Sequence, residues 1–387
     1  MNSAQIEIQL IASLVAIACA IPGTFLVLRK MALITDAISH SILLGIVIGF
    51  FLTNDLSSPL LIPIAALSGI LTVILVEFIQ KTNLVKEDTA IGLVFPTMFS
   101  IGVILIDKKA DDVHLDLDAV LVGKIEYAPL NSFIWDGINL GPKALWVIGI
   151  IALITIILLF AFFKELKIST FDAGLAAALG LSPVAVHYGL MTVASITTVG
   201  AFDAVGAILV IAFMIAPAAI AYLLTNDLIK MLIFSCTFGI VSAISGYWLA
   251  HIINASIAGC MTTILGILFL IVYLFAPNKG YFSVLYRQKQ QRIEVSLLTL
   301  LLHLRNHKDD ETERHVKHLN EHINWQQVRA KSVLDLARNN NMIYIQNDII
   351  SLTEKGEHFT SEAIDYIISN KNSEIEHMKD RFFLFRG

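Results

Sequence analysis

The chain has 387 residues, of which 56% are hydrophobic and only 15% are charged. Soluble domains carry about 25% charged residues, so this composition excludes an ordinary soluble protein and indicates a membrane protein. The three cysteines lie in separate apolar runs, which excludes a disulfide framework or a cysteine metal site.

Charged residues are distributed unevenly along the chain. Residues 1–280 hold 12 Lys and Arg against 17 Asp and Glu, whereas residues 281–387 hold 15 of each. This change predicts a transmembrane domain over residues 1–280 and a small polar domain over residues 281–387. No basic stretch precedes the first apolar run, so we expect a retained span there and not a cleaved signal peptide.

Nine apolar segments are long enough to cross a membrane, which requires about 20 mostly apolar residues. They lie at residues 5–28, 31–53, 59–80, 88–106, 143–163, 182–200, 203–225, 229–251 and 255–277. Eight spans are the alternative, if one of the two segments around Gly200 only enters and returns. The expected fold is therefore an all-α polytopic membrane protein with eight or nine transmembrane helices.

The basic residues predict the orientation, because Lys and Arg accumulate on the cytoplasmic side. Those that follow the first, third, fifth and last segments are Arg29, Lys30, Lys81, Lys86, Lys164, Lys167, Lys279, Arg287, Lys289 and Arg292. All of them fall on one face if the N-terminus lies outside. Lys108, Lys109 and Lys143 are exceptions. This scheme places the C-terminus in the cytoplasm.

Asp36 and His40 lie four residues apart in the second segment, a spacing that stacks two side chains on one helix face. A carboxylate and an imidazole form a plausible half-site for a divalent cation, and ionisable groups within spans are candidates for function. The alternative is an Asp–His pair without metal. Placing the pair near the midplane requires a deep start of this segment or a break of the first at Pro22-Gly23.

A short amphipathic stretch, KISTFDAGLAAALGLSPVAV, connects the fifth and sixth segments at residues 167–186. Ser169 or Thr170 is expected to cap a helix there, and Gly180 to end it. Such an Ala-rich helix can seat in the groove of a partner, and a plain connecting helix is the alternative. Near the segment ends, Glu77, His187 and His251 are expected to have structural roles, whereas Asp203 is placed in an outer turn.

Six sequence motifs follow one another along the chain. They are GTFLVLRKMALITDAISHSILLG (23–45), KEDTAIGLVFPTMFSIGVIL (86–105), DLDAVLVGKIEY (116–127), FDAGLAAALGL (171–181), VGAILVIAFMIAPAAIAYLL (205–224) and IAGCMTTILGILFLIVYLFAPNKG (257–280). Together they resemble the membrane permeases of the manganese/zinc/iron class of ABC importers, over nearly all of residues 5–280.

The resemblance implies a bacterial cytoplasmic-membrane permease that forms a dimer with a like or related permease chain. It also implies two cytoplasmic ATP-binding subunits and an external metal-binding lipoprotein as partners. It places the transported manganese, iron or zinc ion at Asp36 and His40, with no permanently bound cofactor. The ATPase-coupling helix carries over onto Phe171, Asp172, Ala177 and Gly180. The chain has no G-x-x-x-x-G-K-[ST] phosphate loop, so we expect no ATP hydrolysis by this chain itself.

Residues 281–387 extend beyond such a permease. Their patterns predict helices at Ile293–Leu304 and Glu311–Glu321, a third after Asn324, a hairpin around Asn347-Asp348 and a helix from Thr353 to about Ile368. This order resembles a winged helix of the diphtheria-toxin-repressor-like kind, so the expected domain is a small α+β unit.

The role of this extension is less constrained by its sequence. Its net charge of zero argues against nucleic-acid binding, so we expect a regulatory or protein-interaction role. Several histidines suggest metal sensing, and His318 and His322 are the candidate regulatory ligands, with ordinary surface histidines as the alternative. Two competing functions remain open, namely a membrane-tethered metal-responsive DNA-binding regulator and a secondary transporter driven by ion gradients.

Overall fold

The computed structural model describes residues 3–54, 58, 60–109, 123, 125–135, 138–317, 325 and 327–369. The chain divides into two compact units, Met1–Ala276 and Pro277–Gly387, and each is described by itself.

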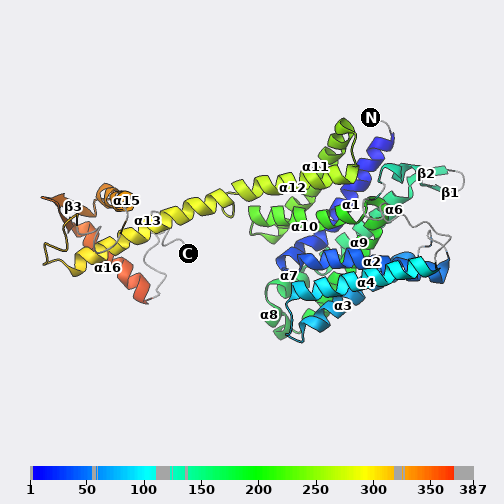
Figure 1. Ribbon diagram of the computed structural model, residues 1–387, viewed down its shortest axis with the longest axis horizontal. Helices are drawn as coiled ribbons and strands as arrows, with labels where there is room; N and C mark the ends of the chain where they lie inside the picture. The colour runs from blue at the N-terminus through cyan, green and yellow to red at the C-terminus, as the bar shows by residue number, and fades with distance from the viewer. Residues whose placement is uncertain are drawn as a thin grey trace. The chain divides into compact units, whose positions relative to one another are not determined.

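The first unit is a bundle of long apolar helices (Figure 1). They are α1 (Ser3–Leu28), α2 (Ala32–Thr53), α3 (Leu61–Gln80), α4 (Glu87–Lys109), α6 (Lys143–Ala161), α9 (Pro183–Val205), α10 (Ala207–Leu224), α11 (Leu228–Ile253) and α12 (Ile257–Phe275). Within the described residues these nine helices are long and apolar enough to cross a membrane. The predicted all-α polytopic class is confirmed, and α9 and α10 are separate helices that meet at Gly206.

Helix α1 lies at the centre of this bundle and packs against α6, α9, α10 and α11. Its middle is built from Ala, Cys and Ile side chains that are fully buried or nearly so. Small residues allow close approach of helices in lipid, and at Gly23 a Cβ would overlap the backbone carbonyl of Met214 on α10. The proposed break at Pro22-Gly23 is wrong, because α1 runs through Pro22 without interruption.

Short elements complete the two ends of the bundle. At one end lie the 3-10 helix η1 (Ile125–Leu130) and the antiparallel hairpin of β1 (Ser132–Trp135) and β2 (Ile138–Pro142). This region falls between the fourth and fifth apolar segments of the sequence, at residues 88–106 and 143–163. The other end carries α7 (Phe163–Phe171) and α8 (Ala173–Ala178), followed by the N-terminus of α9.

The second unit contains α13 (Tyr281–Asn306), α15 (Gln327–Asn339), β3 (Ile343–Gln346), β4 (Ile349–Leu352) and α16 (Glu354–Ser369). Leucines on one face of α13 pack with residues of α15, the hairpin and α16 in a separate core. The turn of the β3–β4 hairpin is Asn347-Asp348, both with positive φ, as hairpins of this length require.

The helix predicted at Glu311–Glu321 is wrong over its described part. Residues 311–317 form turns, and His315 pairs with Ile349 as an isolated β-bridge. The backbone N–H of Val316 donates to the Asp348 carbonyl, and that of Ile350 donates to the Arg314 carbonyl. Pairing with the hairpin therefore overrides the local helical pattern. The winged-helix assignment of the unit stays a prediction.

Candidate metal site and coupling surface

Asp36 and His40 lie in the first half of α2 and share one face of the helix, as their spacing predicts. Asp36 Oδ1 is 3.4 Å from His40 Nε2, and their side chains are 37% and 29% exposed, respectively. Helix α2 begins at Ala32, so Asp36 is about 6 Å and His40 about 12 Å from its start along the helix axis. Both side chains can therefore reach a cation that approaches along the exposed side of α2.

Helix α4 fixes the imidazole of His40. The His40 ring stacks on Phe95 of α4 with ring centroids 5.5 Å apart, and Phe99 of the same helix contacts it edge-on with centroids 6.1 Å apart. These contacts hold the ring beside the Asp36 carboxylate. Two protein ligands would fill only part of the coordination sphere of a divalent transition metal.

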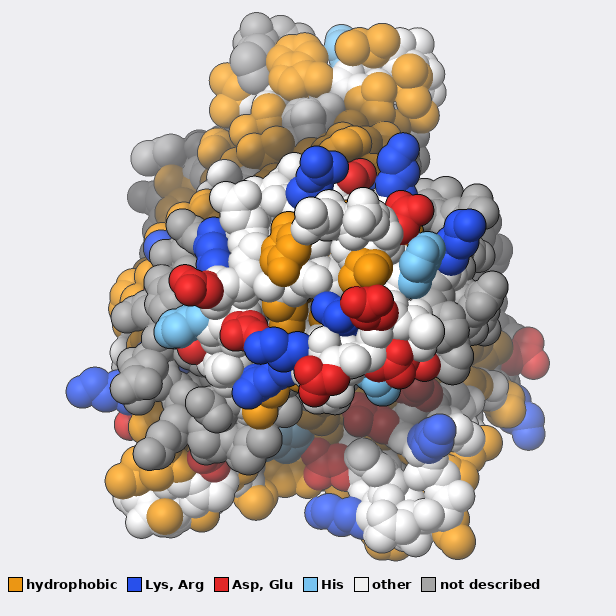
Figure 2. All heavy atoms as spheres, turned by 90° about the vertical axis from the view of Figure 1, so that its left-hand side faces the viewer, with side chains coloured by type: hydrophobic (Ala, Val, Ile, Leu, Met, Phe, Trp, Pro, Cys, Tyr) orange, Lys and Arg blue, Asp and Glu red, His pale blue; other side chains and the backbone are white. Residues whose placement is uncertain are grey.

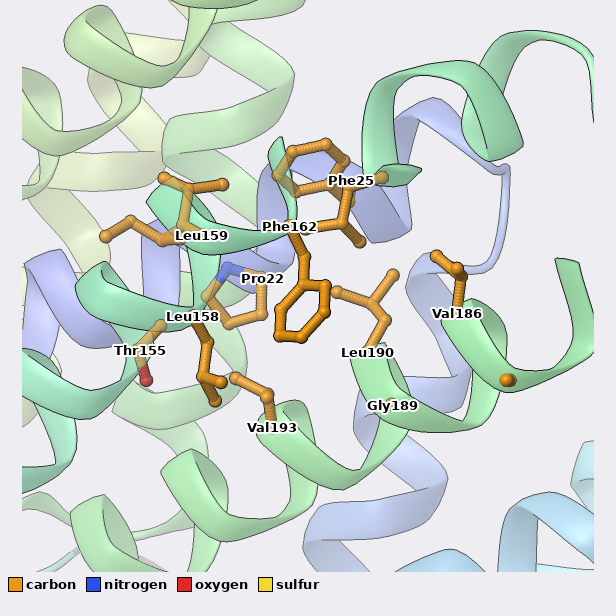
Figure 3. A pocket seen from close by; sticks show the side chains of 13 residues that line it. Pro22, Phe25, Thr155, Leu158, Leu159, Phe162, Val186, Gly189, Leu190 and Val193 are labelled. Carbon is orange, nitrogen blue, oxygen red and sulfur yellow. The ribbon is translucent and has the colours of Figure 1, made fainter. Parts of the chain in front are cut away.

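A cavity between α1, α6 and α9 has an almost entirely apolar lining (Figure 3). Pro22, Phe25, Leu158, Phe162 and Leu190 are among its lining residues, and Thr155 provides its one polar side chain. A cation would find almost no oxygen or nitrogen ligand there, which excludes this cavity as the metal site.

Arg29 joins three elements at the α7–α8 end of the bundle. Its Nε donates to Thr170 Oγ1 (3.1 Å) and its Nη2 to Ser169 Oγ (3.5 Å), both on α7. Its Nη1 lies 3.5 Å from His187 Nδ1 on α9. Arg29 lies in the turn between Leu28, the last residue of α1, and Ala32, the first residue of α2, so it connects α7 and α9 to this turn. Burial lowers the pKa of its guanidinium, which nevertheless stays charged.

Glu77 extends this polar cluster to α3. Its carboxylate accepts hydrogen bonds from His187 Nε2 and from the Tyr188 hydroxyl, the latter at 2.7 Å. A guanidinium only donates, so the Nδ1 of His187 accepts from Arg29 and its Nε2 carries the proton given to Glu77. The sequence did not predict this cluster, because its hydrogen bonds join residues that lie 110 to 158 positions apart in the chain.

Helix α8 is the structure of the predicted coupling motif. Asp172 caps it by accepting a hydrogen bond from the Leu175 N–H (2.8 Å), and Gly180 follows its end with a φ of 79°. Asp172 is thus the cap, and the assignment of Ser169 or Thr170 as caps is wrong. Only Ala176 is buried, whereas Phe171, Ala177 and the leucines around them face outward.

The other singled-out residues have simpler surroundings. His251 stacks on Tyr247 near the end of α11, and Asp203 lies exposed in the last turn of α9 and not in a loop. His318 and His322 lie outside the described residues, so their role as regulatory ligands stays a prediction.

Comparison with known proteins decides the family. Residues 4–276 match the family model described as the ABC 3 transport family. The chain belongs to this family. This ABC 3 chain is 45% identical over 363 residues to the zinc transport system membrane protein TroD of Treponema pallidum, covering 93% of the chain and 98% of TroD. It is 43% identical over 267 residues to the manganese transport system membrane protein MntD of Bacillus subtilis, covering 69% and 90%, respectively.

A solved structure agrees with these matches. PsaBC from Streptococcus pneumoniae in complex with Fab superimposes with a TM-score of 0.62 at 30% identity, covering 73% of the ABC 3 chain and 96% of the PsaBC chain. These findings confirm the permease interpretation over the DNA-binding regulator. They also identify the chain as a multi-pass membrane protein of the bacterial inner membrane.

Proposed function

We propose that this chain is the permease subunit of an ATP-driven importer of divalent transition-metal ions, with manganese as the first candidate and iron or zinc as alternatives. The observation that carries the proposal is the Asp36–His40 pair, 3.4 Å apart and partly exposed in a helix of an ABC 3 family bundle. A mixed carboxylate–imidazole site suits these cations. The named cargoes of TroD and MntD support the same class.

Asp36 and His40 replace part of the hydration of the arriving ion. A second permease chain, identical or related, completes the site with its own copy of the pair across the exposed side of α2. Few ligands keep the binding weak enough for release, since conduction requires that an ion can also leave the site. An external metal-binding lipoprotein delivers the ion, and the ion leaves on the cytoplasmic side after the access changes.

The driving force comes from a separate ATP-binding subunit, which binds at α8. Three apolar side chains are exposed around this helix, namely Phe171 (61%), Leu175 (49%) and Leu179 (60%). Exposed apolar side chains gathered in this way fit a protein interface. Arg29 then passes a displacement of α7 to the start of α2, because it hydrogen-bonds Ser169 and Thr170.

Uptake of the metal tests the proposal. Asp36→Asn and His40→Gln keep the side-chain size and remove a charge or a ring nitrogen ligand, so we expect at least about tenfold slower uptake of radioactive manganese, as loss of even an outer-shell partner costs about 10- to 100-fold. His251→Gln is the matched control, since His251 lies on α11, away from the pair, and stacks on Tyr247 of the same helix. Uptake of manganese, iron and zinc at the parent rate by both site variants would refute the assignment.

A further inference from the structure

A second group of metal-ligating side chains lies in the C-terminal unit, at the end of α13. His303 and His307 are four residues apart, and their ring centroids are 4.7 Å from each other. Glu313 returns from the following turn, and one ligand atom from each of the three residues lies within 4.8 Å of the others. We propose that His303, His307 and Glu313 bind one divalent transition-metal ion, at a site distinct from the Asp36–His40 pair.

The geometry around His303 supports this set. Its Nε2 lies 3.0 Å from the backbone carbonyl oxygen of Glu313 and 3.8 Å from the carboxylate Oε2 of the same residue. The side chains of His303 and Glu313 are only 17% and 21% exposed, respectively, so the two groups are held together at a partly desolvated position. For the ion to bind Nε2, the ring proton that Nε2 donates to this carbonyl moves to Nδ1, and the imidazole stays neutral.

The distances require only a small contraction. With metal–nitrogen and metal–oxygen bonds of about 2.0–2.2 Å, tetrahedral ligand atoms stand about 3.4 Å apart, against the present upper limit of 4.8 Å. Two imidazoles and one carboxylate supply three ligands and leave a position to water, so the ion can exchange. The Asp310 backbone N–H donates to the His307 carbonyl (3.2 Å), so a further carboxylate lies in the turn that follows the two histidines.

Hydrogen bonds to the β3–β4 hairpin, and not the local sequence alone, determine the position of Glu313. Arg314, the next residue, donates from Nη1 to Ser351 Oγ on β4 (3.2 Å), and its carbonyl accepts from the Ile350 N–H. The segment with Glu313 is therefore paired with the hairpin, whereas both histidines belong to α13. An ion at this site links the end of α13 to the β3–β4 hairpin, so its binding stabilises the unit against unfolding.

The test measures metal binding by the full chain in detergent, with Asp36→Asn and His40→Gln as the parent background. The stripped protein is titrated with Co²⁺, whose visible absorption reports nitrogen and oxygen ligands, and then with Zn²⁺ in competition. We expect one equivalent per chain. His303→Gln, His307→Gln and Glu313→Gln are each expected to weaken it at least about tenfold, and Zn²⁺ is expected to displace Co²⁺, following the general affinity order.

His358→Gln is the matched control, because His358 also lies beside a carboxylate, with its Nδ1 3.5 Å from Glu362 Oε1, but on the exposed side of α16. This variant is expected to bind as the parent does. Unchanged Co²⁺ binding in His303→Gln and His307→Gln, or no binding by the parent, would overturn the proposal. If His303→Gln fails to fold, His307→Gln decides the outcome, with circular dichroism as the check of folding. The readout needs no transport, so it stands apart from the test of uptake.

Discussion

The imidazole of His40 rests on the ring of Phe95, so the position of one candidate ligand depends on a residue of another helix. Phe95→Ala removes this stacking contact, which is worth about 0.5–1.5 kcal/mol for aromatic pairs. We expect the KM for manganese uptake to rise about two- to tenfold, because the ring is no longer held beside Asp36. Uptake measured over a range of manganese concentrations gives this value.

Phe160→Ala is the control for that prediction, since Phe160 is a Phe on α6 that is 77% exposed. Its KM should equal that of the parent. An unchanged KM in Phe95→Ala would mean that α2 alone orients His40.

At the scale of single residues, the sequence predicts some of the candidate site residues and not others. Asp36 and His40 could be predicted, because a spacing of four residues places them on one face of any helix. Phe95 could not, since its contact with His40 depends on how α2 and α4 cross. The same limit applies to His303 and Glu313, which a turn and a strand pairing bring together, while the sequence drew attention to His318 and His322.

At the scale of the elements, Gly23 sets how closely α1 and α10 approach. A Cβ at this position would overlap the backbone of Met214, which cannot move without shifting α10. Gly23→Ala is therefore expected to destabilise the bundle by about 1–3 kcal/mol, as overpacking does in tightly packed cores. The midpoint of thermal unfolding in detergent measures the effect.

Gly149→Ala on α6 is the control variant, because no atom lies within 4 Å of a Cβ added at this position. Alanine favours a helix over glycine by up to about 1 kcal/mol, so this variant should unfold at the parent temperature or above it. Equal losses of stability in both variants would contradict the close-approach argument.

Arg29 tests the link between α7 and α2. Arg29→Gln removes the charge and most of the donors that reach Ser169, Thr170 and His187, so a displacement of α7 no longer moves the start of α2. We expect uptake per ATP hydrolysed to fall several-fold in proteoliposomes of the complete transporter. Lys30→Gln, at the neighbouring exposed residue, should keep the parent ratio. A parent ratio in Arg29→Gln would exclude this path.

The elements show why some sequence expectations succeeded. The long apolar runs predicted the nine helices to within a few residues, because a span is defined by its own composition. The helix at Glu311–Glu321 failed over its described part, since hydrogen bonds to Asp348 and Ile350 outweigh its periodicity. Pro22 did not break α1: it is buried within the bundle, where transmembrane helices tolerate proline.

For the whole molecule, charge separates the two units more clearly than any motif. On the face drawn in Figure 2, Lys and Arg side chains are interspersed with Asp and Glu, and no basic patch forms among the side chains shown. Arg329 on α15 donates from its guanidinium to Ser296 Oγ on α13 (2.9 Å), a contact within the unit. Both observations favour a regulatory role of the C-terminal unit over nucleic-acid binding.

The orientation of the chain is the last prediction, and it follows from the two ends of α9. His187, near the start of α9, contacts Arg29, whereas Gly123, beside η1, packs against Val205 at the end of α9. The Arg29 end is basic and the η1 end faces outside if Lys and Arg mark the cytoplasm. An odd number of crossings then puts the residues after α12 on the cytoplasmic side.

Single cysteines test this orientation in a chain whose own cysteines are replaced by alanine. Asn131→Cys, exposed after η1, should react with a membrane-impermeant maleimide in spheroplasts, because it faces the outside. Gln288→Cys, exposed on α13, should react only after permeabilisation, because nine crossings leave it in the cytoplasm. Reaction of both residues in intact spheroplasts would instead match eight crossings, with either α9 or α10 returning to the side it entered from.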